Sequence, residues 1–140
     1  SKWLLTGVTP QMEENKMEKT ILVADDHPEQ VEDMIIELRG RYNVEYVGNG
    51  KAAVERIQKG GLDAAILDWD MACYDDADLF DGDTVAKTAR ELHPNLVLVL
   101  RSSNADRFEE ELEPLGIYCH PKQYGDRRLY AYLNEKLGGV

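Results

Sequence analysis

Five short apolar runs divide the chain, and each is followed by a stretch in which apolar residues recur every three or four positions. The runs predict buried strands, and the stretches between them predict helices that pack one face against the strands. The strands are expected at 20–24, 44–47, 64–67, 96–100 and 117–119, and the last helix at 126–137. Strands that alternate with helices predict an α/β fold, a doubly wound sheet of five parallel strands with helices on both faces.

Polar residues stand where several of these strands end. The first strand is followed by Asp25 and Asp26, and the third leads directly into Asp68. Ser102 and His120 follow the fourth and fifth strands. Because open parallel sheets bind ligands at the carboxyl ends of their strands, we expect these residues to form one site.

The acids of this site predict a bound cation. Three carboxylates that lie close together repel one another, so a proton or a cation is needed among Asp25, Asp26 and Asp68. Carboxylate oxygens with room for water suit Mg²⁺ better than zinc or copper. A single aspartate at a strand end often does no more than end the strand, but three together favour a magnesium site.

The acidic charge of the chain limits its partners. The 140 residues include 27 acidic and 16 basic residues, which give a formal net charge of −11. This charge argues against direct binding to nucleic acid or to anionic membranes, and it favours a cation or a basic partner. No stretch approaches the ~20 apolar residues of a membrane-spanning helix, so no membrane insertion is expected.

The length of the chain fits one domain. Residues 1–18 lack a sustained period and are expected to be an extension, whereas 19–140 are expected to form the domain. Cys73 and Cys119 have no CxxC spacing, so neither a disulfide framework nor a zinc site is predicted, and a reducing cytoplasm is the expected location. The aspartate-rich loop 73–83 is expected to be a solvated surface rather than a second metal site.

Five segments of the sequence together resemble a known family. They are ILVADDHPE around the acidic pair, NGKAAVE after the second strand, LDAAILDWDM around Asp68, LVLVLRSSN at the fourth strand, and the step from His120 to Pro121. As a set they resemble the receiver domain of two-component response regulators, CheY-like in size, over residues 19–138. The resemblance implies a flavodoxin-like sheet with strand order 2-1-3-4-5.

The resemblance also implies a role for each site residue. Asp68 would accept a phosphoryl group from a sensor histidine kinase or a phosphotransfer protein, and an unidentified downstream protein would respond. Asp26, Asp68 and the backbone carbonyl of Asp70 would hold Mg²⁺, while Asp25 would act through a bound water and Ser102 would contact the phosphoryl oxygens. Such roles agree with phosphoryl transfer, which depends on positioning and charge neutralisation. The chain would then be a signalling domain and not an enzyme with a separate substrate.

Several positions depart from the family pattern, and two of them concern the response to the phosphoryl group. His120 stands where the family has a lysine, and Ile117 stands where it often has an aromatic residue. An imidazole supplies positive charge only when it is protonated, so His120 would neutralise the phosphoryl group in a pH-dependent way. If His120 is a bystander, Lys122 or Arg101 is the expected source of that charge. Arg101 is otherwise expected to pair with one of the site aspartates.

Two other functions agree with the sequence. Asp68-Trp69-Asp70 resembles the DxD element of haloacid-dehalogenase-type phosphatases, in which Asp68 would be the nucleophile and Asp70 the acid or base. Against this, the strand is the third in the chain, and no segment remains for a substrate cap. The second alternative is a degenerate receiver that acts only as a docking module, as His120 and Ile117 suggest. Ser102 has a simpler alternative too, as a plain helix cap.

Overall fold

The computed structural model describes residues 18–71 and 80–138, so most of the predicted extension at 1–18 and of the loop at 73–83 lies outside the described residues. The described part forms one sheet of five parallel strands in the order β2-β1-β3-β4-β5, which confirms the predicted fold and strand order. The strands are β1 (Thr20–Ala24), β2 (Asn43–Val47), β3 (Ala64–Asp68), β4 (Val97–Ser102) and β5 (Ile117–Pro121). The helices are α3 (Pro28–Arg39), α4 (Gly50–Gln58), α6 (Gly82–Leu92), α7 (Asp106–Leu112) and α8 (Arg127–Leu137), with 3₁₀ turns η1 (Glu113–Leu115) and η2 (Lys122–Tyr124).

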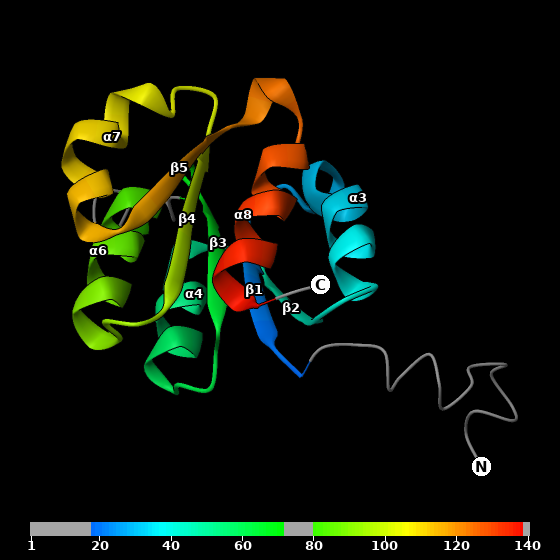
Figure 1. Cartoon of the computed structure of the whole chain (residues 1–140). Coiled ribbons are helices and arrows are strands. Elements are labelled where there is room, and N and C mark those ends of the chain that lie inside the picture. Colours follow the sequence, from blue (N-terminus) through cyan, green and yellow to red (C-terminus); the bar gives the residue numbers. More distant parts are fainter. Residues whose placement is uncertain (1–17, 72–79, 139–140) are drawn as a thin grey trace, which may run out of the picture.

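Helices cover both faces of the sheet (Figure 1). Helices α4, α6 and α7 pack on one face, where Leu67 and Leu98 of the sheet point. Helices α3 and α8 pack on the other face, against Ile66 and Val99. Successive residues of a strand point to opposite faces, so a strand covered on both sides is apolar throughout. All of β3 is buried, and its last residue, Asp68, is a carboxylate inside the protein.

Strands β4 and β5 extend further than the sequence predicts. β4 continues to Ser102 and β5 to Pro121, instead of ending at 100 and 119. In the parallel register, Arg101 lies opposite His120 and Ser102 opposite Pro121. Polar side chains do not end a strand while its backbone still finds partners in the neighbouring strand. Ser102 and His120 therefore belong to the sheet itself.

The helix after β4 is short. α7 begins at Asp106 without a side-chain cap, so the alternative role of Ser102 as a helix cap is wrong. Instead, Oγ of Ser102 accepts a hydrogen bond from the backbone N of Asn104 at 3.0 Å. α7 ends at Leu112 and passes into η1, which contains Pro114. A proline cannot donate the backbone hydrogen bond that would continue an α-helix.

Two glycines allow the first residues of α4 and α6 to lie very close to neighbouring backbone atoms. A Cβ atom at Gly82 would lie 2.2 Å from the carbonyl oxygen of Asp68, and one at Gly50 would lie 2.0 Å from that of Phe80. The backbone N of Gly82 also donates a hydrogen bond to the carbonyl of Trp69 at 2.8 Å. The start of α6 therefore rests directly on the backbone beside Asp68, where only glycine fits without displacement.

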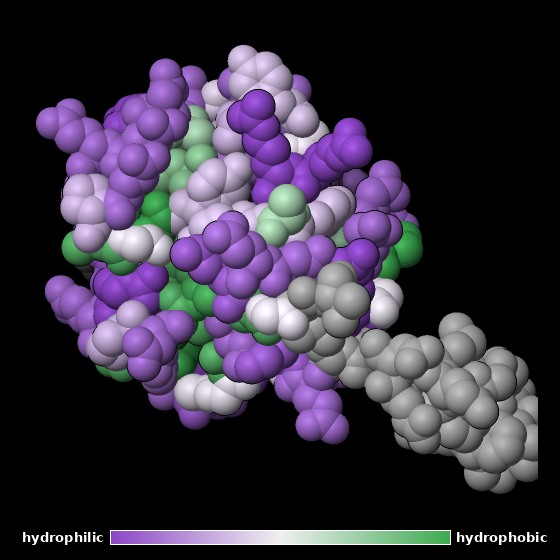
Figure 2. Space-filling view, in the orientation of Figure 1, coloured by the Kyte–Doolittle hydropathy of each residue, from purple (hydrophilic) through white to green (hydrophobic). Residues whose placement is uncertain are grey.

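The visible surface is mostly polar. Hydrophilic side chains predominate on the face seen in Figure 2, and hydrophobic atoms show mainly in gaps between them. The described helices include none with the length and apolar character needed to cross a membrane. The buried apolar residues are instead concentrated in two layers, one on each face of the sheet.

Candidate functional site

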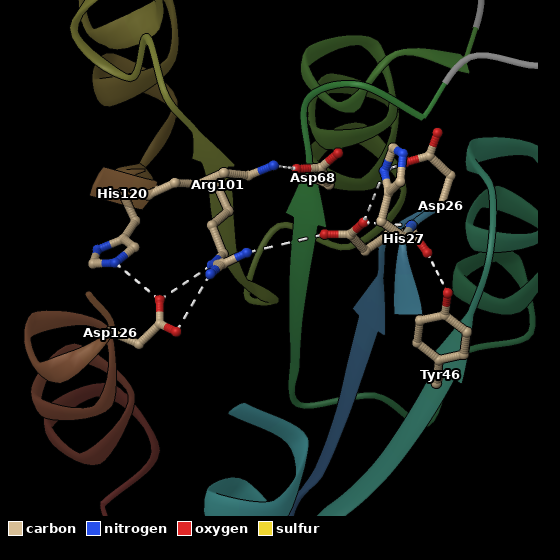
Figure 3. A network of polar contacts seen from close by, with 9 residues as sticks. Asp26, His27, Tyr46, Asp68, Arg101, His120 and Asp126 are labelled. Atoms are coloured by element: carbon tan, nitrogen blue, oxygen red, sulfur yellow. Dashed lines mark hydrogen bonds and ion pairs between the residues drawn. The ribbon is translucent and has the colours of Figure 1, made fainter. Parts of the chain in front are cut away.

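Two buried carboxylates lie at the carboxyl ends of neighbouring strands. Asp25 follows β1 directly, and Asp68 is the last residue of β3. These strands pair with Ala24 opposite Leu67, so both acids reach the same edge of the sheet. Asp25 is 1% exposed and Asp68 is 2% exposed. The third acid, Asp26 (Figure 3), has a side chain that is 33% exposed.

Neighbouring groups hold the acidic pair in place. The backbone N of His27 donates to Oδ1 of Asp25 at 2.8 Å, and the hydroxyl of Tyr46 donates to the carbonyl oxygen of Asp25. Nδ1 of His27 lies 2.7 Å from Oδ1 of Asp26. Asp25, Asp26 and His27 each offer one ligand atom within 4.8 Å of the others, a spacing that a metal ion can bridge. His27 is not among the predicted site residues, and its only signal is its place beside the acidic pair.

Burial changes the acidity of both inner aspartates. Burial raises the pKa of Asp68 to about 6, which Lys122 opposes and the charge of Asp25 reinforces. Burial also raises the pKa of Asp25, although the backbone hydrogen bond from His27 and the charges of Lys122 and Arg101 oppose the rise. Two carboxylates beyond the reach of water resist being ionised together. Additional positive charge at this edge would therefore stabilise both anions.

A lysine already supplies positive charge to Asp68. Nζ of Lys122 contacts Oδ1 of Asp68, and the Lys122 side chain is 25% exposed. Lys122 opens η2, immediately after Pro121 at the end of β5. In the family pattern the lysine precedes the proline, so sequence comparison alone points to His120 and leaves Lys122 as the substitute.

His120 has other partners. It is 1% exposed, and its Nδ1 lies 2.9 Å from the hydroxyl of Tyr118. Its Nε2 lies 2.7 Å from the carbonyl oxygen of Gly125 and 3.3 Å from Oδ1 of Asp126. A carbonyl oxygen only accepts, so Nε2 carries the hydrogen in the contact with Gly125. His120 thus joins β5 to the start of α8, and none of its contacts within the described residues reaches Asp68.

Arg101 connects the acidic site with the start of α8. Its Nε lies 3.1 Å from Oδ1 of Asp126, and its Nη2 lies 3.3 Å from Oδ2 of the same residue. Its Nη1 lies 4.0 Å from Oδ2 of Asp25. The predicted pairing of Arg101 with one of the site aspartates is confirmed. The second partner, Asp126, gives no signal in the sequence beyond its place at the start of the last helix.

Unsatisfied hydrogen-bonding capacity is concentrated at this site. In the described part of the chain, the buried side-chain atoms without a hydrogen bond are Oδ2 of Asp25, Oδ1 of Asp68 and Nη1 of Arg101. Oδ1 of Asp68 has its ion pair with Lys122 but no aligned hydrogen bond. Buried polar atoms in folded proteins nearly always have partners, so the unpaired atoms of Asp25 and Arg101 beside the Asp68–Lys122 ion pair favour a site for a ligand.

The remaining predicted residues, Ser102 and Asp70, lie at the same edge of the sheet. Within the described part of the chain, neither has a side-chain contact with Asp68. Ser102 ends β4 and is 3% exposed, and its Oγ is engaged by the backbone of Asn104. Asp70 lies two residues beyond Asp68 and is exposed. The roles assigned to Ser102 and Asp70 therefore stay predictions.

Comparison with known proteins identifies the fold. No family model and no curated protein sequence matches this chain. The structure is similar to a CheY-like response regulator receiver domain protein from Methanospirillum hungatei, with 21% identity and a TM-score of 0.71 over 87% of this chain and 95% of that one. It is also similar to a response regulator from Thermotoga maritima in complex with Mg(2+)-BeF, with 24% identity and a TM-score of 0.70 over 84% of this chain and 98% of that one.

A third similar structure belongs to a sensor protein. It is the receiver domain of a sensor histidine kinase from Pseudomonas aeruginosa, with a magnesium ion coordinated in the active-site cleft. The identity is 22% and the TM-score 0.69, over 88% of this chain and 100% of that one. At these identities the likeness concerns the arrangement of strands and helices. This chain therefore has the fold of CheY-like response regulator receiver domains.

Proposed function

We propose that this protein is a receiver domain in which Asp68 accepts a phosphoryl group from the phosphohistidine of a sensor histidine kinase or a phosphotransfer protein. The observation that carries this proposal is the position of Asp68. It ends a central strand, is 2% exposed, and has an oxygen atom without a hydrogen bond beside the ammonium of Lys122. Its carboxylate oxygen would form the new bond to phosphorus, while the phosphorus–nitrogen bond breaks and the donor imidazole takes up a proton.

The ligand atoms of the site fit Mg²⁺. Asp25, Asp26 and Asp68 offer carboxylate oxygens, and two of the buried oxygens lack a hydrogen bond. We assign the backbone carbonyl of Asp70 to the same set, as the resemblance to receiver domains implies. A bound Mg²⁺ would supply neutralisation of the charge on the phosphoryl oxygens. The similar structures from Thermotoga maritima and Pseudomonas aeruginosa, both with magnesium, support this assignment.

Among the cations of the site, Lys122 is the one we assign to the phosphoryl group. Its ammonium contacts Asp68, whereas the ring of His120 is held between β5 and α8 by Tyr118 and Gly125. We therefore transfer the role predicted for His120 to Lys122 and give His120 a supporting role. Ser102 keeps its proposed contact with the phosphoryl oxygens, because its Oγ accepts from the backbone N of Asn104 and its hydroxyl hydrogen can still be donated.

The docking-module alternative loses one of its two arguments. It depends on His120 in place of a lysine and on Ile117 in place of an aromatic residue. Because Lys122 contacts Asp68, a lysine is present at the site, and the first of these arguments no longer holds. The phosphatase alternative gains no support, since Asp70, its acid or base, is exposed. An unidentified protein that responds to the modified state, and a cytoplasmic location, remain parts of the proposal.

Acetyl phosphate with Mg²⁺, followed by intact mass spectrometry, tests the proposed function. Wild-type protein should gain the mass of one phosphoryl group, and that group should be lost in alkali. Asp68→Asn should gain nothing, because an amide oxygen is a far weaker nucleophile than a carboxylate. Asp70→Asn removes an exposed acid two residues away and should still become phosphorylated. Modification of Asp68→Asn to the wild-type level would contradict the assignment of the acceptor.

A further inference from the structure

Arg101 is shared between two acids from different parts of the fold. Figure 3 shows its side chain between the end of β3 and the start of α8, with contacts on both sides. Its Nε and Nη2 form hydrogen bonds with Asp126 at 3.1 and 3.3 Å. Its Nη1 lies 4.0 Å from Oδ2 of Asp25, a distance that allows an ion pair but is too long for a hydrogen bond.

Both atoms of the longer contact are unsatisfied. Oδ2 of Asp25 and Nη1 of Arg101 are buried and lack any hydrogen bond. A buried donor and acceptor that face each other without a bond leave the cost of removing them from water uncompensated. A shorter distance between Nη1 of Arg101 and Oδ2 of Asp25 would compensate this cost. A third group that binds the carboxylate would compensate it too. The group that fits a site with three carboxylates is a divalent cation.

We propose that Arg101 is a positioning residue of the acidic site that competes with a divalent cation for Asp25. Without the cation, the guanidinium is a long-range ion-pair partner of Asp25, 4.0 Å away. A cation beside Asp25 repels the guanidinium and leaves Arg101 paired with Asp126 alone. This rests on the cation site of the proposed function and adds a residue that regulates the affinity of that site.

Asp126 can pair with the guanidinium of Arg101 without help from Asp25. Both of its oxygens already accept hydrogen bonds from Arg101, and Nε2 of His120 lies 3.3 Å from its Oδ1. Burial opposes the ionisation of Asp126, but the hydrogen bonds from His120 and Arg101 outweigh burial and lower its pKa. Asp126 directly precedes α8, so a change in its pairing with Arg101 reaches the first turn of that helix.

The magnesium affinity of Arg101→Met, measured by titration calorimetry, tests the competition. Methionine keeps an apolar stem but removes the charge, and affinity should rise about tenfold, since a unit charge near a divalent ion matters to this extent even at high dielectric constant. Arg56→Met is the matched control. It removes the same charge from the last turn of α4, where Arg56 pairs with Glu45, and its affinity should equal that of the wild type. Arg101→Lys keeps the charge and should also remain close to the wild type.

Asp126→Asn tests the other half of the proposal. Without the anion of Asp126, the guanidinium turns to Asp25, so magnesium affinity should fall several-fold. In the Arg101→Met background the same change should have little effect, because no guanidinium remains to redistribute. An equal fall in both backgrounds would mean that Asp126 acts through its charge alone, which overturns the sharing of Arg101.

The outcomes separate this inference from the proposed function. Equal magnesium affinity in Arg101→Met, Arg56→Met and the wild type overturns the competition and leaves the cation site in place. Failure of the wild type to bind magnesium overturns both the competition and the cation site. Phosphorylation of Asp68 is measured separately and tests the acceptor role. If Arg101→Met does not fold by circular dichroism, Arg101→Gln removes the same charge but leaves a hydrogen-bond donor near the position of Nε, and the same rise in affinity is expected.

Discussion

Asp68 is an anion in a place that water hardly reaches. Its side chain is 2% exposed, and burial raises its pKa to about 6. Because the folded protein then holds a proton that the unfolded chain has already lost, stability falls as pH rises from about 4 to about 6. Above this window the full cost of the buried charge remains. Lys122 offsets part of that cost through its contact with Asp68.

Asp68→Asn should therefore stabilise the protein when no divalent cation is present. The gain should be small near about pH 4, at the lower end of that window, and should reach roughly 1–3 kcal/mol near about pH 8. Lys122 loses its partner in this variant, but its side chain is 25% exposed and can return to solvent. Urea unfolding in a chelating buffer at the two pH values gives the measurement.

Asp70→Asn is the control for this pH dependence. Asp70 is exposed, so its replacement should change the free energy of unfolding little at either pH. A gain from Asp68→Asn that is the same at both pH values would contradict ionisation of Asp68 as the cause. The stability of the wild type and its function then oppose each other at one side chain, as is common at functional sites.

At the scale of the elements, the start of α6 packs directly against the backbone at the end of β3. The backbone N of Gly82 donates to the carbonyl of Trp69, and the close approach leaves no space for a Cβ atom. That hypothetical atom would lie 2.2 Å from the carbonyl oxygen of Asp68. Helix and strand end therefore form one packed unit around Asp68.

Gly82→Ala should destabilise the protein and slow phosphorylation by acetyl phosphate. The added methyl group meets backbone atoms, which cannot rotate away, so a loss of about 1–3 kcal/mol is expected. The measurements are urea unfolding and the rate of mass gain. Gly48→Ala is the control, since its Cβ atom would come no closer than 3.7 Å to the hydroxyl of Tyr46. Equal stability and rate in the two variants would show that the close contact at Gly82 has no effect.

At the scale of the whole molecule, a bound cation should stabilise the fold. The acids that would hold it come from β1 and β3, so the complete site exists only in the folded chain. Magnesium at about 100 times its dissociation constant should add about 2.7 kcal/mol to the free energy of unfolding. Trp69 directly follows Asp68, so its fluorescence should respond to magnesium. Asp26→Ala should reduce the gain in stability and weaken this response. A gain that survives unchanged in Asp26→Ala would place the cation elsewhere, and a chelator should reverse the gain in the wild type.

The sequence by itself determined the fold and the acidic core of the site. Apolar runs separated by helical patterns predicted the five strands, because a parallel sheet covered on both faces needs continuous apolar segments. Runs that end in Asp25 and Asp68 predicted acids at one sheet edge, because parallel strands all end on the same side. These are properties of consecutive residues, and they need no knowledge of distant contacts.

Only the tertiary structure decided which cations meet those acids. Lys122 and His120 are two positions apart in the sequence, yet Lys122 contacts Asp68 while His120 contacts Asp126. The path of the chain after β5 makes this choice, and residue type alone does not reveal that path. The link from Arg101 to Asp126 likewise joins residues 25 positions apart through the packing of α8 against the sheet. A long side chain can reach several partners, and only the arrangement of the surrounding elements selects among them.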